Sequence, residues 1–131
     1  MRVLEGEQFL ARVFIGEDDK WHHRPLHRAL LERLRREGFA GTTVFHGVAG
    51  FGARSVVHTA SIVDLSGDLP VVIEIVDDQE HMDKLLPILD EMVTGGALIT
   101  IEKVRVVKYA AGVRGSVPPP PSSAPGSKPK G

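Results

Sequence analysis

The chain has 131 residues, of which 42% are hydrophobic and 25% are charged, and its formal net charge is -1. This length favours one domain with a single core, and the near-neutral charge argues against a nucleic-acid partner, which a broad positive field would attract. The absence of cysteine excludes disulfides, thiolate metal sites and a cysteine nucleophile. The sequence shows no signal peptide and no apolar run of roughly 20 residues, so we expect a cytoplasmic protein without membrane insertion.

The first half of the chain contains a predicted strand, a helix and a second strand. Side chains alternate over residues 9–16 in a way that suits a strand buried on at least one side. Over residues 25–37 leucines recur at helical spacing, with Pro25 suited to the first turn and Gly38 to a C-terminal stop. Residues 42–46 form the second predicted strand.

The second half begins with a glycine-rich stretch, residues 47–69, that has no sustained period. Long excursions of this kind in compact domains are usually functional or mobile. A third strand follows over residues 71–76 and is opened by Pro70. Its odd- and even-numbered residues, which point to opposite faces, are all apolar except Glu74, as is typical of strands buried on both faces.

A second helix and a last strand complete the pattern. The helix has an apolar stripe over residues 82–93 and an aspartate cap at residues 77–78. Pro87 lies inside this stripe, where we expect it to kink the helix or loosen a turn. The last strand covers residues 97–109, and its apolar phase switches near residues 102–103, which predicts a bulge or a bend there.

This order of elements predicts an α+β fold, the ferredoxin-like βαββαβ sandwich, with an antiparallel sheet and two helices on one face. Because the helices cover one face, a strand apolar on both faces needs a second cover, and another subunit is the simplest one. We therefore expect a homo-oligomer. We place the domain at residues 8–112, between an N-terminal extension (1–7) and a Pro/Ser/Gly-rich tail (113–131) that we expect to be disordered.

Several blocks of the sequence resemble the bacterial and archaeal family called domain of unknown function 190 (DUF190). The resemblance extends from about residue 8 to residue 109, and its blocks are residues 47–53, 58–60, 65–66, 68–77, 86–93 and 102–104. The first block reads Gly-Val-Ala-Gly-Phe-Gly-Ala. Since this family is similar in turn to the PII signalling proteins, the resemblance implies a PII-like fold.

The resemblance also implies a function. PII proteins are trimers with their sheets facing inward, and they bind nucleotides in clefts between neighbouring subunits. A flexible T-loop, here about residues 52–69, changes shape with the ligand and docks on a partner, for which a membrane transporter or channel is one candidate. We expect a signalling protein with an adenine nucleotide (AMP, ADP, ATP or a cyclic nucleotide) or another small anion as effector, and no required cofactor.

The candidate ligand site is the turn formed by the consecutive residues Gly50, Phe51, Gly52, Ala53 and Arg54. Glycines let the backbone approach an anion closely, and successive N–H groups form anion-binding nests. PII proteins use a similar turn at the base of the T-loop to hold nucleotide phosphates, so the resemblance strengthens an otherwise weak motif.

Basic residues on the last strand are the second part of the candidate site. Lys103 and Lys108 would add positive charge to the cleft, as basic residues near the end of this strand do in PII proteins. The loop before the strand departs from the family pattern, because residues 94–97 lack the Gly-Asp-Gly-Lys segment that binds nucleotide in PII proteins. This departure weakens the case for a PII-type ATP mode and leaves AMP, ADP, a cyclic nucleotide or an unrelated anion.

Metal binding and catalysis find little support in the sequence. His22, His23 and His27 cluster, but a zinc site needs a further ligand and no cysteine is present, so we expect no metal. Acidic residues and serines show no catalytic spacing, and we expect no enzyme. Two alternatives stay open: a structural or adaptor trimer in which the glycines serve only the turn, and a small enzyme on this common fold.

Overall fold

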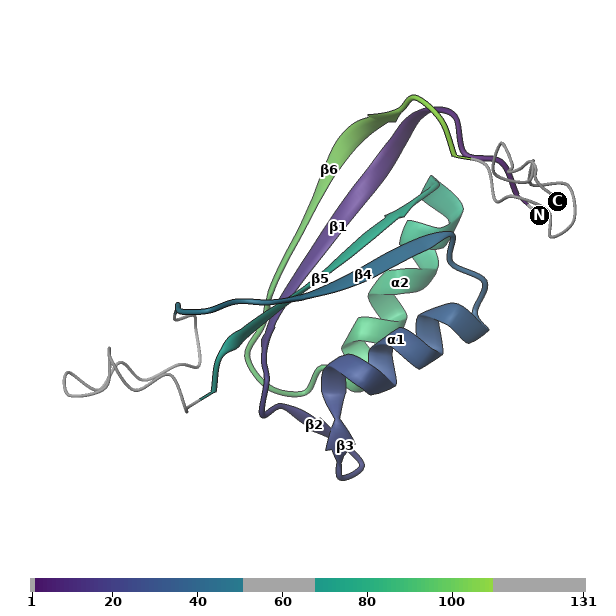
Figure 1. Cartoon of the computed structure of the whole chain (residues 1–131). Helices are drawn as coiled ribbons and strands as arrows, with labels where there is room; N and C mark the ends of the chain where they lie inside the picture. The colour runs from purple at the N-terminus through teal and green to yellow at the C-terminus, as the bar shows by residue number, and fades with distance from the viewer. Residues whose placement is uncertain (1, 51–67, 110–131) are drawn as a thin grey trace, which may run out of the picture.

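The computed structural model describes residues 2–50 and 68–109, so the predicted tail and most of the predicted T-loop lie outside the described residues. The elements are β1 (Gly6–Gly16), β2 (Lys20–Trp21), β3 (Arg24–Pro25), α1 (Leu26–Arg36), β4 (Gly41–His46), β5 (Pro70–Asp77), α2 (Gln79–Met92) and β6 (Leu98–Val106). The main sheet is antiparallel in the order β4-β5-β1-β6, and both helices lie on one of its faces (Figure 1). The predicted ferredoxin-like βαββαβ fold is confirmed.

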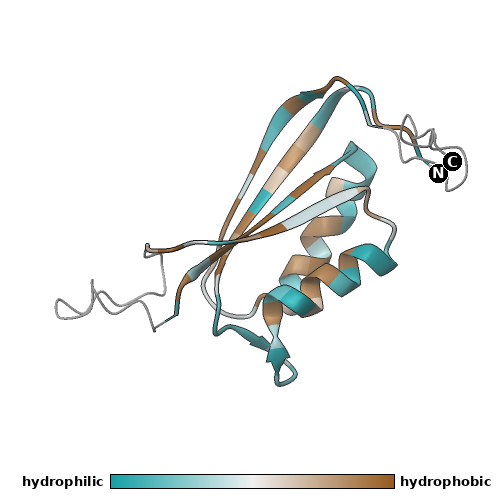
Figure 2. Ribbon diagram, in the orientation of Figure 1, coloured by the Kyte–Doolittle hydropathy of each residue, from teal (hydrophilic) through white to brown (hydrophobic). Residues whose placement is uncertain are grey.

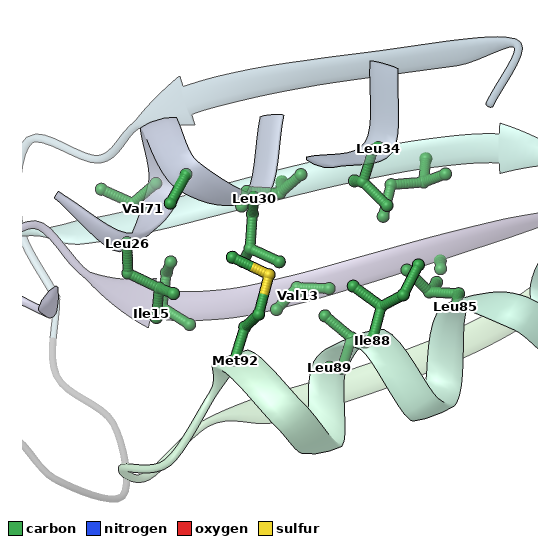
Figure 3. Close-up of a cluster of buried hydrophobic side chains, with 14 of the residues drawn as sticks. Val13, Ile15, Leu26, Leu30, Leu34, Val71, Leu85, Ile88, Leu89 and Met92 are labelled. Carbon is green, nitrogen blue, oxygen red and sulfur yellow. The ribbon is translucent and has the colours of Figure 1, made fainter. Parts of the chain in front are cut away.

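The core lies between the two helices and the three strands β4, β5 and β1. Each helix combines a hydrophobic side with a hydrophilic one (Figure 2), as expected for helices that cover a sheet. Side chains from both helices converge on alternate residues of the strands (Figure 3). The fully buried members include Leu30 and Leu34 from α1, Leu85 from α2, and Val13, Ile73 and Ile75 from the sheet.

Helix α2 has an aspartate N-cap and a proline in its interior. Asp78 is the N-cap, and its carboxylate accepts a hydrogen bond from the backbone N–H of His81. Pro87 lies inside the helix, which runs without a break from Gln79 to Met92. The proline is exposed, so its ring stays out of the core.

We predicted a bulge or a bend near residues 102–103, and of these the bulge is wrong. The register between β1 and β6 is continuous from Gly6 opposite Val106 to Phe14 opposite Leu98. The apolar phase switch has another cause, because β6 is an edge strand that extends beyond the helices. Its residues are mostly exposed on both faces, so no single face imposes a strict alternation.

A short hairpin between β1 and α1 was not predicted. Trp21 pairs with Arg24, and the two loop residues, His22 and His23, both have positive φ angles (48° and 68°). Such two-residue loops strongly favour Asn-Gly, because glycine has no Cβ and asparagine tolerates the left-handed region through local hydrogen bonds, whereas most other residues are strained there. The His22 ring stacks on Trp21 with centroids 4.0 Å apart, and Trp21 itself packs against the core.

Replacing His22 by asparagine and His23 by glycine is expected to relieve this strain. We expect the double variant to raise the free energy of unfolding by about 1 kcal/mol. Urea denaturation at a fixed protein concentration measures the change. The matched control is His22→Ala with His23→Ala, which keeps the strained backbone and should bring no gain; equal stabilisation by both variants would contradict the explanation.

The first residues of the chain are held by hydrogen bonds at the end of the sheet where β5 ends. The Arg2 guanidinium pairs with both oxygens of Asp77 (2.6 and 3.0 Å) and with one oxygen of Asp78 (3.0 Å). The Asp77 carboxylate is completely buried, and Leu4 is buried as well. Since β1 begins at Gly6, the described part of the expected extension (1–7) packs as part of the domain.

The face of the sheet opposite the helices carries an apolar row. Residues paired across antiparallel strands point to the same face, so Phe45, Val72, Phe14 and Leu98 follow one another across all four strands. Phe45 and Leu98 are 50% and 58% exposed. This row is hereafter called the apolar row.

An ion cluster lies beside the apolar row on the same face. Arg12 donates hydrogen bonds to Glu74, directly opposite on β5, and to Glu102 on β6. These contacts favour the charged forms, and they raise the pKa of Arg12. The open face therefore combines apolar surface with charges that are already paired.

Candidate functional site

The two ends of the segment 51–67 are held at one end of the sheet. Before the segment, the N–H of Gly47 donates to the carbonyl of Pro70 (2.7 Å). After it, the carbonyl of Leu69 accepts from Glu17 (2.8 Å), and the carboxylate of Asp68 accepts from the N–H of Asp18 (2.8 Å). The strands β4 and β5 and the turn after β1 thus form one hydrogen-bonded base, hereafter the loop base.

Two glycines of the loop base lie against Pro70. A Cβ on Gly47 would come within 2.6 Å of Cγ in the Pro70 ring and 3.2 Å of its carbonyl oxygen. Gly50 has a φ of 153°, which side chains rarely adopt, and a Cβ there would come within 3.2 Å of the same ring carbon. A side chain at either position would therefore push the turn away from β5.

Among the residues of the predicted site, Gly50 is described and belongs to the loop base. Phe51, Gly52, Ala53 and Arg54 lie outside the described residues. What is described of the turn is thus its first part, where the backbone leaves β4.

The two predicted lysines lie on β6 and beyond it. Lys103 is opposite Phe9 of β1, and its ammonium is 3.6 Å from the Glu7 carboxylate, with both side chains about two-thirds exposed. Lys108 follows the end of β6 and is exposed. Both lysines are therefore solvated, and an exposed pair such as Lys103–Glu7 contributes little to stability.

The structure does not bring Gly50 and Lys108 together within one chain. The loop base lies where Gly16 pairs with Pro70, whereas β6 ends where Val106 pairs with Gly6. These are opposite ends of the sheet (Figure 1), separated by the length of β1, about 30 Å at the usual rise per residue. A site that uses both residues must take them from different chains.

A pair of histidines and a carboxylate adjoin the loop base. The ring of His27, in the first turn of α1, meets the ring of His46, the last residue of β4, edge to face with centroids 5.2 Å apart. The Nδ1 of His46 is 3.6 Å from a carboxylate oxygen of Glu17. The Nδ1 of His27 is buried and has no hydrogen-bond partner among the described residues.

The surroundings of His27 disfavour its charged form. Burial of the ring lowers the pKa of His27 below its usual 6.5, and His46 and Arg28 lower it further, against an opposite effect of Glu17. In the unfolded chain the ring takes up its proton as the pH falls through 6.5, while the folded chain resists it until lower pH. This contribution to stability is therefore complete above pH 6.5 and is lost as the pH falls.

We expect His27→Gln to reduce the loss of stability between pH 7.5 and pH 5. The effect should stay well below the ceiling of about 1.4 kcal/mol per pH unit for one proton, because the ring is partly solvated. Urea denaturation of both proteins across this range measures it, with His23→Gln, an exposed histidine, as control. Parallel curves for the wild type and His27→Gln would contradict the assignment.

A second titratable cluster lies at the opposite end, at the start of α2. Asp77, Asp78 and His81 place ligand atoms within 4.8 Å of one another, which is compatible with a metal ion. The Arg2 guanidinium already donates hydrogen bonds to both carboxylates, however, and His81 Nδ1 is 2.8 Å from Asp78. Burial raises the pKa of Asp78, but its hydrogen bonds with His81 and the charge of Arg2 lower it more, so the net pKa is below the usual value.

Comparison with known proteins assigns the family. The family model DUF190, described as "Uncharacterized ACR", matches residues 8–106. A UPF0166 protein of Aquifex aeolicus is 36% identical over 107 residues, which cover 82% of this chain and 98% of the relative. A UPF0166 protein of Methanocaldococcus jannaschii is 35% identical over 99 residues (76% and 91%). The chain belongs to the DUF190 family.

Solved structures of similar shape are PII-like. A candidate PII-like signalling protein of Thermus thermophilus matches with a TM-score of 0.54 and 22% identity, over 82% of this chain and 94% of that one. The protein CPII of Thiomonas intermedia, solved with ADP and bicarbonate, matches with a TM-score of 0.59 and 14% identity (82% and 93%). At these identities the likeness concerns the fold, which is PII-like.

Sequence reasoning missed the residues that meet across the loop base. His46 was assigned to a strand and Glu17 to a connection, and neither follows a motif with His27. A signal was present in that Glu17 directly follows the first predicted strand and His46 ends the second; in the sheet these two strands flank β5 and end at the same side of it. Among the described residues, no helix has the length and apolar character to cross a membrane.

Proposed function

We propose that this chain is a PII-like regulatory protein that senses a small anionic ligand, an adenine nucleotide, and relays its presence to a partner protein through residues 52–69. The observation that carries the proposal is the loop base, where Gly47 and Gly50 leave the backbone close to Pro70 with no side chain between. The N–H of Gly47 is already bonded to Pro70, so we assign the anion contact to the successive N–H groups of the glycine-rich turn that follows it. A phosphate held there acts directly on the segment that follows.

The proposal includes a homo-oligomer, a trimer in the arrangement that the family resemblance implies. Two observations support it. The apolar row lies on the sheet face opposite the helices, and a second copy would cover it. Gly50 and Lys108 lie at opposite ends of one chain, so a site between two chains unites what one chain keeps apart.

Regulation follows if the ligand prefers one state of the segment. A ligand shifts a conformational equilibrium only by the difference between its affinities for the two states. We propose that nucleotide binding at the loop base selects the state that docks on the partner, with a membrane transporter or channel as one candidate. In this role the protein acts by binding and needs no catalytic residues.

Titration calorimetry with AMP, ADP, ATP and cyclic AMP tests the proposal on the full chain. We expect saturable binding of at least one of them, weakened more than about tenfold by Gly50→Val, whose side chain would displace the turn, and by Lys108→Ala, which removes a positive charge from the proposed phosphate site. Gly38→Ala and Lys84→Ala are the matched controls: a glycine with positive φ that lies away from the loop base, and an exposed lysine on α2. No binding at millimolar nucleotide, or equal binding by all variants, would overturn the proposal.

The alternative is an adaptor trimer that uses the same surface without a ligand. It predicts that the partner binds equally well with and without nucleotide. A pull-down of the partner in the presence and absence of the tightest-binding nucleotide separates the two functions. A change of severalfold or more supports the sensor.

A further inference from the structure

The two helices carry opposite charge. Helix α1 contains four arginines and one glutamate, whereas α2 contains four acidic residues and one lysine. Both helices lie on the same face of the sheet (Figure 1), and the formal net charge of the whole chain is only -1. The helix layer therefore has a positive side and a negative side.

The arginines of α1 differ in what they contact. Arg33 is partly buried and lies 3.4 Å from the carboxylate of Glu91, so it joins α1 to α2. Arg28, Arg35 and Arg36 are exposed, and they form no ion pair among the described residues. Three positive charges of α1 thus point to solvent without a counter-charge in the part of the chain that the structure describes.

These arginines share one side of the helix. Residues three, four and seven apart lie on the same side, so Arg28, Leu31 and Arg35 form a row with Arg36 beside it. Leu31, in the middle of the row, is 39% exposed. Lys20 lies at the start of the helix, because its strand partner is the N-cap residue of α1. These residues are hereafter called the basic face.

The one acid on the outward side of α1 is already paired. Glu32 lies one turn from Arg28, and its carboxylate is 2.7 Å from the guanidinium of Arg24 in β3. This contact lowers the pKa of Glu32, so the carboxylate stays charged and bound to Arg24. It therefore leaves the exposed cations of the basic face available to another molecule.

Helix stability does not account for the position of Arg28. Cations are unfavourable near the N-terminus of a helix, where the helix dipole is positive, and Arg28 is the third residue of α1. The first turn contains no acid, and the N-cap makes no side-chain hydrogen bond. Arg35 and Arg36, in the last turn, do suit the dipole. Residues that break a local rule in this way are expected at functional sites.

We propose that the basic face binds an acidic segment of a partner protein. Arginine suits this role because its planar guanidinium donates paired hydrogen bonds to a carboxylate. Leu31, between the arginines, offers a contact for an apolar side chain among the acids of that segment.

The acidic side of the helix layer favours a narrow partner. The contact between Arg33 and Glu91 shows that the acids of α2 begin directly beside α1. A broad anionic surface, such as a membrane or a nucleic-acid duplex, would meet those acids as well and be repelled by them. A single segment that lies along α1 avoids them.

The basic face begins at the same end of the molecule as the loop base. His27, which precedes Arg28, touches the ring of His46, and His46 precedes Gly47 of the loop base. A partner that docks on the segment 51–67 would therefore reach α1 with a neighbouring acidic segment. This contact goes beyond the proposed nucleotide sensing and does not depend on it.

Fluorescence anisotropy with a labelled glutamate-rich peptide tests the proposal on the full chain, without nucleotide. The peptide has the length of α1 and a leucine at its centre. We expect saturable binding at low ionic strength that weakens as salt screens the charges. The double variant Arg28→Glu with Arg35→Glu should lower the affinity at least about tenfold, because each change turns an attraction into a repulsion.

The matched control is Lys84→Glu with Arg105→Glu. It changes the net charge by the same amount at exposed cations of α2 and β6, and it should bind the peptide nearly as the wild type does. Thermal unfolding separates binding from folding. Arg28→Glu puts an acid where the helix dipole favours one, so this single variant should keep or raise Tm while it weakens binding.

A measurement on the unaltered protein covers the case in which a variant folds poorly. The peptide should shift the backbone amide NMR signals of Arg28, Leu31 and Arg35 and leave those of α2 in place. The proposal is overturned if the peptide does not bind, or if both double variants lose affinity equally. It is also overturned if phosphatidylserine vesicles or duplex DNA bind the basic face more tightly than the peptide does.

Discussion

Replacing Asp77 by alanine is expected to lower the free energy of unfolding by about 3 kcal/mol. The buried carboxylate accepts hydrogen bonds from the N–H groups of Ala40 (2.7 Å) and Asp78 (2.8 Å) in addition to its two contacts with Arg2. Removing it leaves those donors unpaired, and breaking a buried ion pair on one side typically costs 3–5 kcal/mol. We take the lower end because Arg2 is partly exposed to water.

Thermal unfolding measures this effect. For a domain of about 100 residues, a loss of 3 kcal/mol corresponds to a fall in Tm of roughly 10–20 °C. Asp77→Asn keeps an oxygen for the Ala40 N–H and should fall between the wild type and the alanine variant. Asp83→Ala, an exposed aspartate on α2, is the control and should shift Tm little. A small effect for Asp77→Ala would mean that the Arg2 contact is not formed in solution.

Replacing Val72 by glutamate is expected to dissociate the proposed homo-oligomer into monomers. Val72 is the centre of the apolar row, between Phe45 and Phe14, and faces away from the helices. In an assembly that covers this face, each copy would bury a new carboxylate, and Arg12, on the same face, already pairs with two acids. A penalty of several kcal/mol per buried charge raises the dissociation constant at least about a thousandfold.

Sedimentation velocity at micromolar concentration measures the assembly. Leu86→Glu is the matched control, because Leu86 is a hydrophobic residue that is 46% exposed on α2, on the other side of the molecule. We expect this control to keep the mass of the wild type. A monomeric wild type, or a Val72→Glu variant of unchanged mass, would contradict assembly through the open face; dissociation by Leu86→Glu would point to the helices instead.

The fold was predictable because the apolar residues of its core helices and strands recur at clear helical or strand spacing. Leu30 and Leu34 mark the buried face of α1, and the alternation over residues 9–16 and the aspartate cap of α2 matched the observed elements. The bulge near residues 102–103 failed for a physical reason. An edge strand with two solvated faces gives no reliable phase, so its hydrophobic pattern carries little information about backbone geometry.

The candidate site was predictable only in part. Gly50 stood out because a glycine-rich turn has a local signature, whereas the contact of His27 with His46 joins residues that come together only in the folded chain. The hairpin of β2 and β3 was not predicted because its two loop residues are histidines, whereas such loops are usually recognised in a sequence by a glycine. Placement of the predicted lysines at the opposite end from the loop base required the strand register.

The place of β1 at the centre of the sheet has a consequence for how this chain folds. Both of its neighbours, β5 and β6, lie in the second half of the sequence, so β1 leaves the ribosome long before either partner exists. During that interval a strand rich in apolar residues offers two unpaired edges to other chains. Such sequence-distant pairing slows folding relative to helical bundles of similar size. Truncated or stalled chains that end before Pro70 should therefore aggregate, and holding β1 in an unpaired state is the step at which a chaperone would help most.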